Sequence, residues 1–241
     1  MPLTVLIAGF GPFPGAPDNP TAALAKTLAR RRRPALSGIT RIFHVFPTSH
    51  AAVERELPDL IARHRPDLVL LFGVAPRTPC FRIEARAKNR RSTLFADVAG
   101  VHPPLAIRPR GPAALVASAP QHALRIAARR ARMPARVSID AGKYLCNFAY
   151  WRALELASKD GVLVQFVHVP SVRRGSARRR RANDKRRLTE ADLLRAGEAI
   201  LLALLVPARI AARRAPHAVA AIRSRSDSAA TRPQRRVAAA G

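Results

Sequence analysis

The run Leu68-Val69-Leu70-Leu71-Phe72, ended by Gly73, decides how the rest of the chain is interpreted. A continuous apolar run of this length is typical of a strand that is buried on both faces of a sheet. Two other apolar runs lie far from it in the sequence, at residues 3–8 and 162–169, and each is bounded by glycine and proline. The sequence therefore predicts a sheet whose inner strands are covered on both sides.

The segments between these runs have the apolar spacing of amphipathic helices. Residues 50–64 place Val53, Leu57 and Leu60 on one face, residues 147–158 have a similar pattern, and Thr189 can cap a helix that ends at Leu205. Strands that alternate with helices are typical of an α/β protein. We therefore expect a three-layer, open, twisted mixed sheet with helices on both faces, formed by a single domain.

The remaining segments complete this outline. Residues 39–46 and 81–87 are expected to be strands, residues 115–132 a helix, and residues 88–112 an irregular connection. From Pro207 onward the composition changes to Ala, Arg, Ser and Pro, which cannot bury enough apolar surface to fold. We expect the α/β domain to comprise residues 1–206 and residues 207–241 to form a mostly disordered tail.

The charge of the chain is strongly basic and unevenly distributed. Its 43 lysines and arginines against 15 acidic residues give a formal net charge of +28 at pH 7, and arginines gather at residues 30–33, 173–187 and 207–241. Such runs attract phosphates and acidic partners, but no aromatic residues alternate with them to stack on bases. A coding bias toward Arg and Ala gives the same composition, so nucleic-acid binding is an alternative here and not the first expectation.

Several classes of protein are not indicated. No apolar run reaches the roughly 18 residues that cross a bilayer, and no basic leader precedes the first strand. Two cysteines cannot form a disulfide framework, so a reducing compartment, the cytoplasm, is expected. The histidines show no metal-ligand grouping, and Gly9-Phe10-Gly11-Pro12 lacks the Lys-Ser/Thr of a phosphate loop. We expect no metal, no cofactor and no membrane association.

Cys146 is a candidate nucleophile because it stands immediately before the helical pattern that starts at Asn147. A thiol at a helix N-terminus is close to backbone N–H groups that have no intrahelical acceptor. This dipole contributes about 0.3–1 kcal/mol at exposed sites, and one pKa unit corresponds to about 1.4 kcal/mol. The helix alone therefore moves the thiol pKa by less than a unit, and an active thiolate needs a second partner, typically a histidine.

His168 and Glu84 are the candidate partners of this thiol. His168 lies at the carboxyl end of the predicted strand 162–169, where sites gather in open α/β sheets, and Glu84 lies near the end of strand 81–87. A carboxylate that binds one imidazole nitrogen fixes the tautomer of the ring. Spacing alone does not join the three residues, and a core cysteine, a structural histidine and a solvated glutamate remain the alternative interpretation.

Four segments of the chain are informative together. In chain order they are Gly9-Phe10-Gly11-Pro12-Phe13 with Asn19-Pro20-Thr21, Glu84-Ala85-Arg86-Ala87-Lys88-Asn89, Ala141-Gly142-Lys143-Tyr144-Leu145-Cys146-Asn147, and Phe166-Val167-His168-Val169-Pro170. These segments resemble the signatures of the pyroglutamyl peptidase I family of cysteine peptidases. They occur in the order that the family has, and the resemblance covers residues 3 to about 205. The combination is more specific than any one of the segments.

The resemblance implies a function and a set of roles. The residues that match the family's catalytic triad are Cys146 as nucleophile, His168 as base and Glu84 as the group that orients the base, and those that match its pyroglutamyl pocket are Phe10 and Phe13. The resemblance implies removal of an N-terminal pyroglutamyl residue from a peptide substrate through a thioester acyl-enzyme, without cofactor. It also implies a homo-tetramer.

The sequence departs from the family's pattern around these residues. Leu94 stands where the family has an arginine implicated in oxyanion stabilisation, Val74 replaces a glutamine, and Ala85 replaces the arginine that follows the glutamate. Loss of one oxyanion donor typically costs about a hundred- to a thousandfold in rate. Two alternatives to an efficient peptidase therefore stay open. One is a diverged member with weak or altered amidase activity or peptide binding only, and the other is a basic protein that binds nucleic acid or an acidic partner.

Overall fold

The computed structural model of the chain describes residues 2–13, 15–92, 97, 100, 103–157, 160–172 and 188–230, with side chains as far as residue 214. Its centre is a six-stranded sheet with the strand order β2-β1-β3-β8-β4-β7. These strands are β1 (Leu3–Phe10), β2 (Ile39–Phe46), β3 (Leu68–Val74), β4 (Phe81–Glu84), β7 (Ala135–Ser138) and β8 (Leu163–Val169). The sequence prediction of an inner position for residues 68–72 is confirmed, since β3 lies between β1 and β8 and is buried throughout.

The sheet is mixed. Strands β2, β1, β3 and β8 are parallel, whereas β4 is antiparallel to β8 and parallel to β7. A separate two-stranded ladder pairs β5 (Arg86–Lys88) with β6 (Ala114–Val116) in antiparallel orientation. The reversal at β4 matters for the site, because it places Arg82 opposite His168 and Glu84 opposite Phe166.

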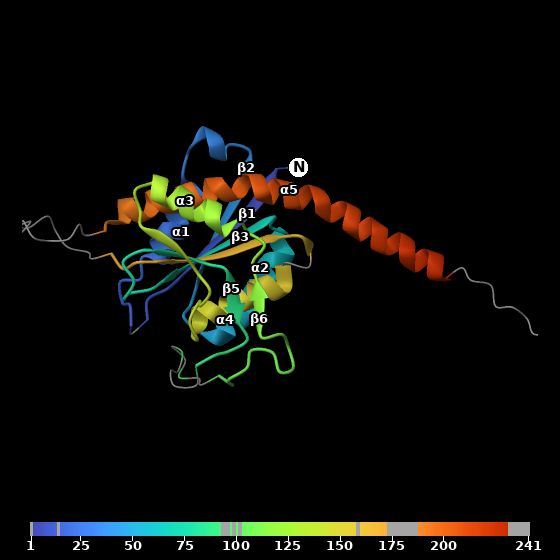
Figure 1. Cartoon of the computed structure of the whole chain (residues 1–241), viewed down its shortest axis with the longest axis horizontal. Coiled ribbons are helices and arrows are strands. Elements are labelled where there is room, and N and C mark those ends of the chain that lie inside the picture. Colours follow the sequence, from blue (N-terminus) through green and yellow to red (C-terminus); the bar gives the residue numbers. More distant parts are fainter. Residues whose placement is uncertain are drawn as a thin grey trace, which may run out of the picture.

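Helices cover both faces of the sheet, as Figure 1 shows. On one face α1 (Thr21–Arg30), α3 (Gln121–Arg130) and α5 (Glu190–Ala230) bury apolar residues against the sheet, and on the other α2 (His50–His64) and α4 (Leu145–Ala157) do so. A short 3₁₀ helix, η1 (Pro34–Leu36), precedes β2. Each helix has a buried apolar stripe, as amphipathic surface helices do. The predicted α/β class with helices on both sides of a mixed sheet is confirmed.

Two predicted elements have different boundaries, because residues 86–88 and 114–116 pair with each other in a separate two-stranded sheet. The expected strand at residues 81–87 ends at Glu84, and Ala85 separates it from β5, which belongs to the other sheet. The expected helix at residues 115–132 is restricted to Gln121–Arg130, and its first residues form β6 instead. Pro120 explains the second difference, because the residue before a proline is disfavoured in the helical conformation.

The last helix is longer than predicted. Thr189 caps α5, since its hydroxyl accepts the Asp192 N–H at 3.2 Å and its own N–H donates to the Asp192 carboxylate at 3.0 Å. The helix was expected to end at Leu205, with a disordered segment from Pro207, but it continues to Ala230 and extends beyond the sheet (Figure 1). Ala208 is fully buried in the core. Residues 231–241 lie outside the described part of the chain.

None of the described helices is both long enough and apolar enough to cross a membrane.

Candidate active site

Cys146 lies in the first turn of α4, on the side of the helix that faces the sheet. We expected it to precede the helix, but α4 begins at Leu145. The first helical hydrogen bond runs from the Phe148 N–H to the Tyr144 carbonyl at 3.2 Å. The N–H groups of the first turn, including that of Cys146 itself, therefore have no acceptor within the helix. This arrangement leaves donors beside the thiol sulfur.

The start of α4 is fixed by polar contacts with neighbouring segments. The buried Asn147 carboxamide accepts the Lys88 N–H at 2.8 Å and donates to the Lys88 and Arg90 carbonyls at 2.8 and 2.9 Å. In the preceding loop, the Asp140 carboxylate accepts the Gly142 N–H at 3.1 Å and binds the Lys88 ammonium at 3.0 Å. Gly142 has a φ of 86°, a conformation that favours glycine. These contacts fix the position of the first turn of α4, and therefore of the Cys146 thiol, relative to the sheet.

Gly73 provides the space into which the Cys146 sulfur fits. A Cβ atom at Gly73 would lie 2.8 Å from Sγ of Cys146 and 2.7 Å from the Phe166 ring. No real Cβ makes contacts this short, so only glycine allows the sulfur to pack directly on β3. The sequence predicts Gly73 only as the end of a strand, because its role at the site depends on which helix packs over it.

His168 is buried on β8 and has partners on two sides. Its Nδ1 lies 2.8 Å from Oε1 of Glu84, and on the other side the Cys146 thiol is near enough to influence the pKa of the ring. Because Nδ1 binds the carboxylate, Nε2 is the nitrogen available to the thiol. Burial opposes protonation of the ring, but the hydrogen bonds and negative charges of Cys146 and Glu84 outweigh it and raise the pKa of His168 to about 9.

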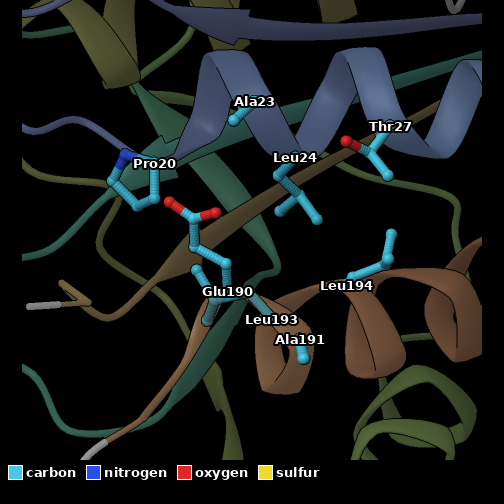
Figure 2. A pocket seen from close by; sticks show the side chains of 8 residues that line it. All are labelled: Pro20, Ala23, Leu24, Thr27, Glu190, Ala191, Leu193 and Leu194. Carbon is cyan, nitrogen blue, oxygen red and sulfur yellow. The ribbon is translucent and has the colours of Figure 1, made fainter. Parts of the chain in front are cut away.

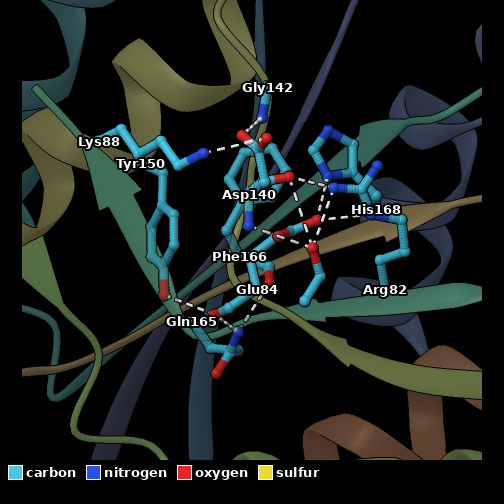
Figure 3. Close-up of polar contacts among 10 residues, drawn as sticks. Arg82, Glu84, Lys88, Asp140, Gly142, Tyr150, Gln165, Phe166 and His168 are labelled. Carbon is cyan, nitrogen blue, oxygen red and sulfur yellow. Dashed lines mark hydrogen bonds and ion pairs between the residues drawn. The ribbon is translucent and has the colours of Figure 1, made fainter. Parts of the chain in front are cut away.

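Glu84 binds His168 from the neighbouring, antiparallel strand β4. The sequence predicts His168 at the carboxyl end of its strand and Glu84 near the end of another, but not the relative direction of the two strands. Since β4 runs against β8, Glu84 is paired with Phe166, and its side chain extends along the sheet to the histidine. Its backbone carbonyl accepts the Tyr150 hydroxyl at 2.8 Å and the Gln165 amide at 2.9 Å (Figure 3). The pKa of Tyr150 is raised by burial and by the charge of Glu84.

Arg82 is the member of this cluster that sequence reasoning missed. Its Nε lies 3.0 Å from Oε1 of Glu84 (Figure 3). The sequence does contain a signal for this contact: Arg82 and Glu84 are two residues apart in a predicted strand, and such residues point to the same face of the sheet. That signal is weak by itself, since any strand has such pairs and an arginine near a glutamate is common on protein surfaces.

The two predicted pocket phenylalanines have different environments. Phe10 is 3% exposed and packs on Phe46 and Phe166, with ring centroids 5.8 and 6.4 Å away. Phe13 is partly exposed, and its ring centroid lies 6.5 Å from that of Tyr144. Phe13 is therefore near the loop that leads to Cys146, whereas Phe10 supports the ring that packs against His168. Their contact with substrate stays a prediction.

The predicted departures from the family pattern are only partly visible. Val74 is 7% exposed at the end of β3, so an apolar side chain fills that position. Leu94 and the arginine-rich residues 173–187 lie outside the described residues. Where side chains are described, no three histidine, cysteine or acidic residues are grouped so that they could hold a metal ion.

A sheet covered by helices, with a thiol at a helix N-terminus next to a buried imidazole and carboxylate, defines the arrangement that cysteine peptidases use. The family model described as "Pyroglutamyl peptidase" matches residues 3–184. The chain therefore belongs to the pyroglutamyl peptidase family.

Individual relatives agree with this assignment. The chain is 34% identical over 171 residues to the pyrrolidone-carboxylate peptidase of Thermococcus kodakarensis, covering 70% of this chain and 81% of that protein. It is 33% identical over 172 residues to the protein of the same name from Deinococcus radiodurans, covering 70% and 78%. Among solved structures, pyrrolidone carboxyl peptidases from Fervidobacterium islandicum (TM-score 0.74, 26% identity, 84% and 98% coverage) and Thermococcus litoralis (TM-score 0.72, 27% identity, 84% and 93% coverage) share the fold.

Proposed function

We propose that the protein removes an N-terminal pyroglutamyl residue from peptides, with Cys146 as nucleophile, His168 as base and Glu84 as the orienting carboxylate. The observation that carries the proposal is the placement of three groups. Glu84 Oε1 lies 2.8 Å from Nδ1 of His168, the Cys146 sulfur packs on Gly73, which is the residue paired with His168, and both His168 and Glu84 are buried. The family assignment supports the same activity.

The proposed reaction has two steps. His168 takes the proton of Cys146, and the thiolate attacks the carbonyl carbon of the pyroglutamyl residue; the oxyanion is stabilised by N–H groups in the first turn of α4. The C–N bond then breaks, and the imidazolium gives its proton to the amine of the departing peptide. In the second step a water molecule, deprotonated by His168, hydrolyses the thioester, releases pyroglutamate and restores the thiol.

The proposed pocket suits a flat, uncharged lactam ring. Phe13 packs near Tyr144, which immediately precedes the thiol-bearing helix, and Phe10 is buried against Phe46 and Phe166. A pyroglutamyl group has no free amine, so the pocket needs no carboxylate to pair with one. On this basis we expect the pyroglutamyl amide to be preferred over amides with an unblocked N-terminus, whose charged ammonium is costly to remove from water.

The test is hydrolysis of a fluorogenic pyroglutamyl amide under reducing conditions, with alanyl and glutaminyl amides as unblocked comparisons. Cys146→Ala is expected to abolish release of the fluorophore. Cys80→Ser removes the other free cysteine and is expected to keep wild-type activity. A purified, folded Cys146→Ala protein that still hydrolyses the amide would disprove the assignment of the nucleophile.

A second candidate is a diverged member of the family with weak or altered amidase activity, or peptide binding only. It is favoured by the buried, apolar Val74 where the family has a glutamine. A wild-type protein that binds pyroglutamyl peptides in calorimetry but hydrolyses none of the amides would select this candidate.

Partners and location stay proposals that follow from the same family. We propose a cytoplasmic homo-tetramer, which light scattering of the purified protein tests. Nucleic-acid binding through the arginine-rich segments is the remaining alternative. It requires that the binding constant for duplex DNA decrease steeply as the salt concentration rises.

A further inference from the structure

We propose that Arg82 is a positioning residue of this site: it holds the Glu84 carboxylate in place and joins it to the segment that leads to Cys146. The inference rests on the proposed function, because Glu84 is taken to orient the catalytic imidazole. It goes beyond the three residues that the sequence identified, and it assigns a task to an arginine outside the quoted motifs.

The contacts of Arg82 connect two parts of the site. Its Nε makes an ion pair with Oε1 of Glu84 at 3.0 Å, although the N–H is not aligned for a hydrogen bond. Its Nη2 donates to the Ser138 hydroxyl at 3.0 Å. The same nitrogen donates to the Asp140 carbonyl (Figure 3). Ser138 is the last residue of β7, and Asp140 belongs to the connection that runs from β7 to α4. One guanidinium therefore binds both the carboxylate and the segment that leads to the thiol.

The backbone makes this placement rigid. Arg82 lies directly opposite His168 in the β4–β8 pairing, and Glu84 lies directly opposite Ser138 in the β4–β7 pairing. Both side chains of β4 point to the same face, because they are two residues apart. The arginine thus approaches the carboxylate from its own strand, and a rotation of the Glu84 side chain away from His168 would break both contacts of Oε1.

The charge of Arg82 is needed because Glu84 is completely buried. A carboxylate that is removed from water without a compensating charge becomes protonated. Oε2 of Glu84 has no hydrogen-bond partner in the described part of the chain, so Oε1 and its two neighbours carry the compensation. An arginine stays protonated at every relevant pH, whereas His168 loses its charge during the reaction. Arg82 is then the permanent cation beside Glu84.

Other charged groups lie near this pair and enter any pH dependence. His168 faces Glu84 from β8, and Cys146 and Tyr150 belong to α4, with the Tyr150 hydroxyl on the Glu84 carbonyl. The Asp140 carboxylate lies beyond Arg82, and the pKa of Asp140 is lowered: burial opposes this, but Lys88, the Gly142 N–H and Arg82 favour its charged form. Lys88 binds Asp140 directly, so the loss of Arg82 leaves that carboxylate paired.

Arg86 offers a matched control for Arg82. It lies two residues beyond Glu84, and its Nε donates to the Ile139 carbonyl at 3.0 Å, in the same β7–α4 connection. It is an arginine that binds the same loop but has no ion pair with Glu84 among the described contacts. Arg86→Met therefore removes a loop contact and a positive charge from the neighbourhood without touching the carboxylate.

The experiment measures the pH dependence of Cys146 alkylation by iodoacetamide in a Cys80→Ser background, which does not require turnover. Arg82→Met is expected to move the alkylation midpoint upward by about 1 pH unit, because Glu84 loses its nearby cation and no longer holds the His168 imidazolium that stabilises the thiolate. Arg82→Lys is expected to stay within about half a unit of wild type, and Arg86→Met to leave the midpoint unchanged. On the pyroglutamyl amide, Arg82→Met is expected to lower kcat about tenfold or more with little change in KM.

A second arm tests whether Arg82 acts through Glu84. In a Glu84→Gln background the change Arg82→Met is expected to add less than a twofold loss in kcat and no further shift in the alkylation midpoint, because residues of one network are not additive. Full additivity would overturn the proposal, as would an unshifted midpoint in a folded Arg82→Met protein. If Arg82→Met does not fold, Arg82→Gln replaces it, since its amide keeps a donor for Ser138 and lacks the charge.

The two proposals fail separately. A wild-type protein that hydrolyses no pyroglutamyl amide contradicts the proposed function. The alkylation midpoints do not require hydrolysis, and they still show whether Arg82 influences the pH at which Cys146 becomes reactive.

Discussion

Gly73 of β3 and His168 of β8 are directly paired across two parallel strands, and the Cys146 sulfur rests on the Gly73 backbone beside the imidazole. The thiol and the base are thus brought together by a residue that has no side chain. The space that Gly73 leaves open is as important to the site as the groups that fill it.

Gly73→Ala is expected to displace the thiol. The new methyl group would lie 2.8 Å from Sγ and 2.7 Å from the Phe166 ring, so the helix or the ring must shift. We expect a loss of about 1–3 kcal/mol in the free energy of unfolding and a fall in kcat on the pyroglutamyl amide of about a hundredfold, since a misplacement of about 1 Å can cost that much.

Gly197→Ala is the control for crowding alone. Its methyl group would lie 3.2 Å from the side chains of Leu24 and Leu28, on the other face of the sheet. It is expected to change thermal stability but not kcat. A Gly73→Ala protein with wild-type kcat would show that the sulfur does not need this position.

Cys146→Ala is expected to lower the pKa of His168. Burial disfavours the imidazolium, and the hydrogen bond to Cys146 and the charge of its sulfur are the largest of the opposing effects that bring the pKa to about 9. Removal of the sulfur leaves only Glu84 to oppose burial. The imidazole titration followed by NMR measures the shift, with Cys80→Ser as the unshifted reference; an unchanged titration would mean that the thiol and the ring do not interact.

The alkaline limb of the pH profile of kcat/KM is expected near pH 9. The leaving amine needs the proton of the His168 imidazolium, and this form is lost as the pH rises through a pKa of about 9. Because Glu84 favours the charged ring, Glu84→Gln is expected to move this limb to lower pH, by about one unit. Initial rates on the fluorogenic amide at low substrate concentration measure it, and a limb that moves to higher pH would contradict the role of Glu84.

Tyr150→Phe is expected to affect stability more than activity. The Tyr150 hydroxyl is buried and donates to the Glu84 carbonyl, and its loss costs about 0.5–1.5 kcal/mol of stability. The Gln165 amide binds the same carbonyl at 2.9 Å and keeps the strand in place. We therefore expect kcat to fall by less than about fivefold. The test is to measure thermal unfolding and kcat for Tyr150→Phe, for Gln165→Leu and for the double variant. If the two side chains replace each other at the Glu84 carbonyl, only the double variant loses most of its activity.

The fold could be predicted wherever the signal is local. Residues 39–46 and 50–64 have the periods of a strand and of an amphipathic helix, and β2 and α2 have these bounds. The prediction failed where a long-range partner decides the outcome: residues 114–116 pair with β5 instead of starting a helix, and the tail sequence after Pro207 continues α5, in which Ala208 packs against the core.

The sequence by itself determined the α/β class, the family, and the three residues that motif order marks as a triad, because apolar periodicity and motif order are written along the chain. Only the tertiary structure decided that β4 runs against β8, and this reversal sets Arg82 opposite His168 and makes Glu84 reach along the sheet. Strand direction and register depend on contacts between residues far apart in the chain, such as Glu84 and His168, which are 84 positions apart. Local sequence patterns do not encode the free energy of such contacts.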